Sequence, residues 1–228
     1  MSLSARSRML LGFVLANIAI VAVAAAVYIN RPIPPPQIQG VLLSEASALP
    51  AFRLLDQGGG TFTNSDLLGR WHLVSYGFTT CPDIRPTTLS QLSAAVTQLG
   101  DQADDLRVLF YSVDHRRDTV NQLAAYLPFF NEEFVGLTHL DDPDNTHLPF
   151  ERGLGMVARL VPNEDPDSSD YQVVHGLTLF LLNPRGELQA IFEPGNAGLG
   201  VRSYQPDKLA ADYLAVRQYL ARESSPAG

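Results

Sequence analysis

The amino-acid sequence predicts an α/β domain, built as a three-layer sandwich, behind an N-terminal transmembrane helix. Three observations lead to this fold class. An uncharged apolar run covers residues 9–29, apolar segments of strand length alternate with segments of helical periodicity from residue 52 onward, and a strand hairpin followed by a helix ends the chain. Alternating strands and helices that finish with a hairpin and a last helix describe a sandwich of the thioredoxin type.

The overall composition is that of a globular protein with an acidic balance. The 228 residues include 16 Lys and Arg against 24 Asp and Glu, a formal net charge of −8, and 46% of them are hydrophobic. Such a chain can bury a core of ordinary size. Lys208 is the single lysine and no basic cluster is visible, so we expect no nucleic-acid partner, because phosphate binding needs a basic surface.

The first predicted element is a transmembrane helix over residues 9–29. The segment carries no charge, and about 20 such residues, at ~1.5 Å rise each, cross the apolar core of a bilayer. Arg6 and Arg8 precede it and Arg31 follows it, so the positive-inside rule predicts cytoplasmic residues 1–8 and an exported C-terminal domain. We therefore expect a single-pass protein of the cell inner membrane whose domain faces the periplasm.

A cleaved signal peptide is the alternative interpretation of this apolar run. Small residues near its end, such as Ala22, Ala24 and Ala26, could satisfy a signal peptidase. The apolar part of a signal peptide is usually about 7–15 residues long, shorter than this run. The length therefore favours an uncleaved anchor.

A proline-rich stalk is predicted after the anchor, over residues 30–49. Four prolines lie between residues 31 and 40, and proline biases the chain toward extended geometry and cannot sustain a helix. The folded domain is then expected over residues 50–222, with residues 223–228 as a disordered tail.

The first half of the domain reads as a hairpin followed by strand, helix, strand and helix. Short apolar pieces flank Gly58, Gly59 and Gly60 in the predicted hairpin. The next elements are expected at 71–78 (strand), 87–99 (helix), 106–113 (strand) and 119–127 (helix). Asp118 is placed to cap the second helix.

The second half begins with a possible strand at 135–140. Residues 141–170 are polar and rich in proline, so we expect loops there, with a short helix at 148–153 and a brief strand at 156–161. Two apolar strands at 177–182 and 187–192, joined by Asn183-Pro184-Arg185-Gly186, form the clearest hairpin in the chain. Asp207 opens the final helix.

The stretch GFTTCPDIRP, residues 77–86, holds the only cysteine of the chain, Cys81. It follows a predicted strand and begins a predicted helix, where unpaired N–H groups and the helix dipole favour a thiolate. Arg85 adds a positive charge nearby. A lone cysteine is often a small buried hydrophobe, but a turn flanked by Pro82 and Asp83 is a poor core position, which favours a functional role.

Three separated motifs resemble the Sco/SenC family of membrane-anchored, thioredoxin-fold copper proteins. They are GFTTCPDIRP, YSVDHRRDT at 111–119 and VVHGLTLFLLNPRGEL at 173–188, and the likeness covers roughly residues 50–220. The resemblance implies copper as the metal and a role in delivering copper to, or maturing the thiols of, the binuclear copper centre of cytochrome c oxidase. An oxidase subunit or another assembly factor is then the expected partner.

The resemblance also implies the ligands, which in this family are two cysteines of one loop and a distant histidine. The first cysteine corresponds to Cys81, the histidine to His175 and the second cysteine to Arg85. Thiolate and imidazole suit Cu(I), but a guanidinium near the metal repels it by up to ~4 kcal/mol at ~4 Å and an effective dielectric constant of ~20. We therefore expect weakened or altered copper binding, with Asp83 either orienting Arg85 or capping its turn.

Two other functions remain open. One cysteine cannot close an internal disulfide, so a redox role would use mixed disulfides formed by Cys81. A non-catalytic module that docks onto an assembly partner is the other alternative, and a binding role is favoured over an enzymatic one. The remaining histidines, His72, His115, His139 and His147, have no comparable support, although His115 lies beside Asp114 in YSVDHRRDT near the expected active-site end, so a role for it stays open. Asp114 could orient Arg85 or a neighbouring imidazole, but a turn cap is favoured. Met156 offers a thioether that suits Cu(I), but a core position is favoured.

Overall fold

The computed structural model describes residues 5–29, 31, 33–80, 88–139, 142–162, 171–196 and 202–224. The chain divides into two units, residues 1–35 with 218–228 and residues 36–217. Cys81, Asp83 and Arg85 lie outside the described residues.

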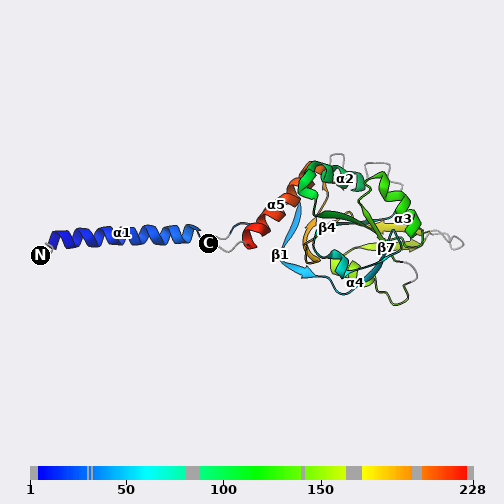
Figure 1. Ribbon diagram of the computed structural model, residues 1–228, viewed down its shortest axis with the longest axis horizontal. Coiled ribbons are helices and arrows are strands. Elements are labelled where there is room, and N and C mark those ends of the chain that lie inside the picture. The colour runs from blue at the N-terminus through cyan, green and yellow to red at the C-terminus, as the bar shows by residue number, and fades with distance from the viewer. Residues whose placement is uncertain are drawn as a thin grey trace. The chain divides into compact units, whose positions relative to one another are not determined.

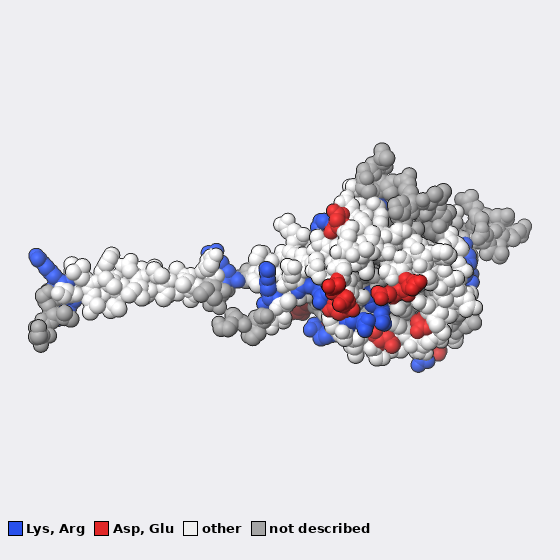
Figure 2. Space-filling model, turned by 45° about the horizontal axis from the view of Figure 1, so that its top comes forward, with Lys and Arg blue, Asp and Glu red and all other residues white. Residues whose placement is uncertain are grey.

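Helix α1 (Ala5–Ile29) is the apolar element of the first unit. Its segment Ala5–Tyr28 has a mean hydropathy of 2.6 and is long enough to cross a membrane, a property that a signal sequence shares. Figure 2 shows this helix as a white rod between basic side chains at its two ends. The helix begins four residues before the predicted span.

An eight-stranded sheet forms the centre of the second unit, in the order β1-β10-β9-β4-β5-β6-β2-β3. Strands β4, β5 and β6 pair in parallel, and the other neighbours pair antiparallel. The strands are β1 (Gly40–Ala48), β2 (Arg53–Asp56), β3 (Thr61–Thr63), β4 (Trp71–Gly77), β5 (Leu106–Ser112), β6 (Val135–Thr138), β9 (Leu179–Leu182) and β10 (Glu187–Phe192). This arrangement confirms the predicted thioredoxin-like α/β class.

Helices cover both faces of the sheet, as Figure 1 shows. On one side lie α2 (Thr88–Leu99), α3 (Val120–Tyr126) and the start of α5 (Pro206–Ser224), where the Tyr213 ring meets the Trp71 ring edge-on at 6.3 Å. On the other side α4 (Leu148–Leu154) adds Phe150 and Leu154 to the main core. Because strand side chains alternate between faces, each central strand contributes side chains to the packing on both sides of the sheet.

Short elements complete the described fold. Two small antiparallel sheets pair β7 (Ala158–Pro162) with β8 (Tyr171–His175) and β11 (Gly195–Asn196) with β12 (Arg202–Ser203). Turns of 3-10 helix occupy Asn64–Leu67, Gly100–Ala103 and Leu127–Phe129. The predicted β9–β10 turn is confirmed: Gly186 has φ +74° and its N–H donates to Asn183 O at 2.8 Å.

The structure differs from the sequence prediction at the start of the domain. Residues 40–48 were assigned to the stalk, but they form β1, which pairs antiparallel with β10. Val41, Leu42 and Leu43 follow the last proline and can donate their backbone N–H groups to a neighbouring strand. The sheet therefore begins about ten residues before the predicted domain boundary at 50. Met156 packs against the core, as predicted.

Candidate metal site and a second histidine cluster

His175 is the predicted ligand that the structure describes. It is the last residue of β8, where it pairs with Ala158 of β7. It is therefore not part of hairpin strand β9, which begins at Leu179. Its ring lies edge-on to Tyr76 at 6.0 Å and to Phe78 at 5.6 Å. A Cβ atom added at Gly77 would lie 3.4 Å from His175 Cε1. His175 is thus held at the end of β4, the strand that leads into the cysteine motif.

One hydrogen bond fixes the tautomer of His175. Nδ1 lies 2.8 Å from the backbone oxygen of Gly176, and a carbonyl can only accept, so Nδ1 carries the proton. The neutral ring then presents Nε2 with a free lone pair, which is the form that binds metals.

A small, mainly apolar cavity of about 90 Å³ adjoins this histidine. The end of β4 and the first turn of α2 contribute to its wall, together with His175, Leu177 and the rings of Phe78, Phe110 and Tyr126. Leu177 is 39% exposed. The mainly apolar wall lowers the effective dielectric constant beside the imidazole and so strengthens electrostatic effects there.

Asp118 ties the start of the cysteine motif to the end of β5. Its carboxylate accepts from Thr79 N at 2.8 Å, from Thr79 Oγ1 at 2.6 Å and from Ser112 Oγ at 2.6 Å. The sequence assigned Asp118 to the cap of α3, and that was wrong: Thr119 is the cap and accepts from Gln122 N at 3.3 Å. A buried aspartate with three donors positions the backbone two residues before Cys81.

Asp114 also does more than cap a turn. Its backbone oxygen accepts from Arg117 N and Asp118 N, as a cap would, while its buried carboxylate accepts from Arg117 Nε and from the Tyr171 hydroxyl. The Arg117 guanidinium lies 4.3 Å from the centre of the Tyr171 ring and 5.8 Å from that of Phe78. Partial burial and the bond to Asp114 raise the pKa of Tyr171. A fixed cation therefore lies beside Tyr171 and beside Phe78, the third residue before Cys81.

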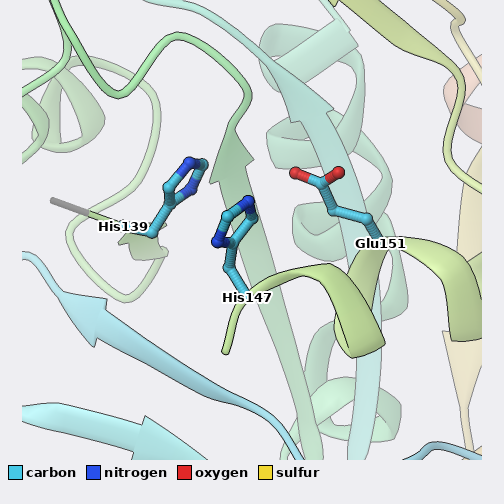
Figure 3. Close-up of side chains that lie close together, drawn as sticks. All are labelled: His139, His147 and Glu151. Carbon is cyan, nitrogen blue, oxygen red and sulfur yellow. The ribbon is translucent and has the colours of Figure 1, made fainter. Parts of the chain in front are cut away.

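Three further histidines, His115, His139 and His147, form a stack. His139 follows β6, and its ring lies parallel to that of His147 with centroids 3.6 Å apart. His115, after β5, contacts His139 at 4.3 Å. Figure 3 shows His139 and His147 side by side, with the carboxylate of Glu151 turned toward His147.

Burial favours the neutral form of two of these rings, His139 and His115. It lowers the pKa of His139 to about 3, with the neighbouring His147 and His115 acting in the same direction. It also lowers the pKa of His115, where the Arg116 guanidinium adds to the effect. The one signal of this cluster in the sequence is the spacing of His147 and Glu151, four residues apart, which places both on one face of a helix.

Comparisons with known proteins identify the family of the chain. The sequence profile of the SCO1/SenC family matches residues 42–199. This chain belongs to the SCO1/SenC family. A Stutzerimonas stutzeri protein, for which copper binding is proposed in its name, is 35% identical over 155 residues, covering 67% of this chain and 72% of that protein.

Two further SCO1/SenC relatives extend the comparison. Protein sco1 of Schizosaccharomyces pombe is 33% identical over 144 residues, which cover 62% of this chain and 53% of the yeast protein. The crystal structure of Arabidopsis thaliana ScoI with copper bound has a TM-score of 0.61 at 29% identity and covers 75% of this chain and 99% of that one. Copper is thus a metal that solved members of the family hold.

Proposed function

We propose that this SCO1/SenC protein is a membrane-anchored copper-binding protein that assists assembly of the copper centre of cytochrome c oxidase, the process associated with its family. Cys81 and His175 are the proposed ligands, and Arg85 and Asp83 modulate the site. Helix α1 is the proposed inner-membrane anchor, with the domain on the periplasmic side, and an oxidase subunit or assembly factor is the proposed partner.

The observation that carries this proposal is the position and tautomer of His175. Its Nε2 carries the lone pair that can bind a metal, because Nδ1 donates to Gly176 O, and its ring packs against Phe78. Cys81 is the third residue after Phe78, so their Cα atoms lie at most about 11 Å apart. A thiolate side chain within that reach can approach the imidazole, and the pair suits Cu(I).

The residues around this site supply positioning and charge. Asp118 holds Thr79, so the segment before Cys81 starts from a fixed point. The charge of Arg117 is paired with Asp114, whereas Arg85, if its side chain faces the metal, opposes a bound cation, lowers copper affinity and eases its release. A carrier that hands its metal to a partner requires such release, and copper is here cargo rather than a resident cofactor.

A Cu(I) titration of the full-length protein in detergent, against a competing chelator, tests the proposal. We expect about one equivalent to bind, with Cys81→Ser and His175→Gln each lowering the affinity at least 100-fold, and with His72→Gln as the matched histidine control. Unchanged affinity in either ligand variant contradicts the assignment. Formation of mixed disulfides by Cys81, without metal binding, would instead favour the redox alternative.

Two substitutions at Arg85 separate charge from missing sulfur. Arg85→Leu removes the cation only, and if the side chain faces the metal the gain is up to about a thousandfold, from ~4 kcal/mol of repulsion at ~1.4 kcal/mol per decade. Arg85→Cys adds a thiolate as well and should exceed the leucine variant. Equal affinities in both variants contradict a ligand position at residue 85.

A further inference from the structure

The stacked histidines belong to a second group of metal-binding side chains. His139, His147 and Glu151 each offer a ligand atom, and these atoms lie within 4.8 Å of one another. His147 is the residue before α4 and Glu151 lies one turn later, while His139 comes from the loop after β6 (Figure 3). None of these residues belongs to the Cys81 and His175 site.

The hydrogen bonds around His147 leave its Nε2 free. Nδ1 lies 2.6 Å from Asp142 Oδ2, and since a carboxylate only accepts, Nδ1 is the donor. Asp142 is itself held by His147 N at 2.9 Å and Thr146 Oγ1 at 3.2 Å. A carboxylate that orients a histidine through its second nitrogen is the usual support of a metal ligand.

Tyr111 fixes His139 in the same way. Its hydroxyl donates its one proton to Glu151 Oε1 at 2.6 Å. The hydroxyl oxygen, 2.9 Å from His139 Nδ1, must therefore accept from that nitrogen. Nε2 of His139 is then unprotonated, and Tyr111 links a histidine ligand to a carboxylate ligand.

From this geometry we propose that His139, His147 and Glu151 form a second metal site for a borderline divalent cation, Cu²⁺ or Zn²⁺. Two imidazoles and a carboxylate without sulfur match the preferences of these ions and not of Cu(I). Metal bonds of about 2.0–2.1 Å bring donor atoms to roughly 3 Å from one another, so the parallel rings must turn toward a common point. His115, in contact with His139, is placed to add a fourth ligand.

The experiment uses the full-length Cys81→Ser/His175→Gln protein, which lacks the ligands of the proposed copper-carrier function. This second site, which is proposed in addition to the carrier function, can therefore fail its test without any consequence for that function, and the reverse also holds. Titration with Cu²⁺ and with Zn²⁺ should show one stoichiometric equivalent, and the Cu²⁺ spectrum by electron paramagnetic resonance should show coupling to nitrogen. A variant that carries His147→Gln in addition to these two substitutions is the comparison. If it binds Cu²⁺ and Zn²⁺ as tightly, the binding is adventitious and the proposal is overturned.

A second variant guards against loss of folding. Glu151→Gln keeps an oxygen that accepts from Tyr111, so the fold should persist, but it removes the anionic ligand and should weaken binding at least tenfold. Glu193→Gln, a surface exchange of the same type, should leave binding unchanged. Equal affinities in the Glu151 and Glu193 variants overturn the proposal.

Discussion

His72 makes the stability of this domain depend on pH in a way that one substitution can remove. The side chain is buried in β4, and neither ring nitrogen has a hydrogen-bond partner of normal geometry among the described residues. Burial, followed by the charges of Arg107 and Arg70, lowers the pKa of His72 from 6.5 to about 4. The folded protein therefore keeps this ring neutral at pH values where the unfolded chain already protonates it.

The sign and size of the effect follow from proton linkage. Because the unfolded state binds the proton first, stability falls as the pH decreases from about 6.5 to about 4 and is unaffected above that window. With pKa values of 6.5 unfolded and about 4 folded, the free energy of unfolding drops by about 2 kcal/mol between pH 7.5 and pH 5. The full loss, below both values, is about 3 kcal/mol at ~1.36 kcal/mol per unit.

Urea unfolding of the full-length protein and of His72→Leu, measured from pH 7.5 to 5, tests this reasoning. Trp71 is the only tryptophan and is buried, so its fluorescence reports the transition. The difference between wild type and variant should grow by about 2 kcal/mol toward pH 5, since leucine cannot titrate. His72→Gln should lose the same pH dependence at lower absolute stability. Parallel curves for wild type and both variants would refute the lowered pKa.

Two further predictions concern the surroundings of His175. Asp118→Ala removes the carboxylate that accepts hydrogen bonds from Thr79 and Ser112. It should lower the free energy of unfolding, measured in urea, by about 3–5 kcal/mol. Ser112→Ala removes only one of these hydrogen bonds and should lower the free energy of unfolding by no more than half of that amount. Gly176→Ala places a Cβ 2.4 Å from the Tyr76 hydroxyl. The clash should lower the free energy of unfolding by about 1–3 kcal/mol and weaken Cu(I) binding. Normal stability and normal Cu(I) affinity would contradict this packing.

The central strands could be predicted from the sequence because they are mainly apolar. The strand expected at 71–78 is β4 at Trp71–Gly77, and the one expected at 106–113 is β5 at Leu106–Ser112. Edge elements lack that signal. β1 contains serine and glutamate and becomes a strand only through pairing with β10, far away in sequence, while β8 is half-exposed along its length. Their existence depends on tertiary contacts that a local pattern does not encode.

The site was predictable to the extent that motifs encoded it. His175 was assigned through the resemblance, and the structure supplies its tautomer and its aromatic neighbours. The histidine stack could not be predicted, because its members follow β5, follow β6 and precede α4. Asp118 shows a different limit: as a residue near a helix start it matched a cap, but its carboxylate bonds Thr79 and Ser112 instead.

The end of β5, in the motif YSVDHRRDT, lies next to both proposed metal sites. Tyr111 and Ser112 are consecutive, so their side chains point to opposite faces of the sheet. Tyr111 reaches His139 and Glu151 on the α4 side, whereas Ser112 reaches Asp118, which holds the segment before Cys81. Because β4 and β5 are parallel, their carboxyl ends meet at one edge of the sheet, where α/β folds bind ligands. The two proposed sites thus share a rigid strand but no ligand, which lets substitutions address each one separately.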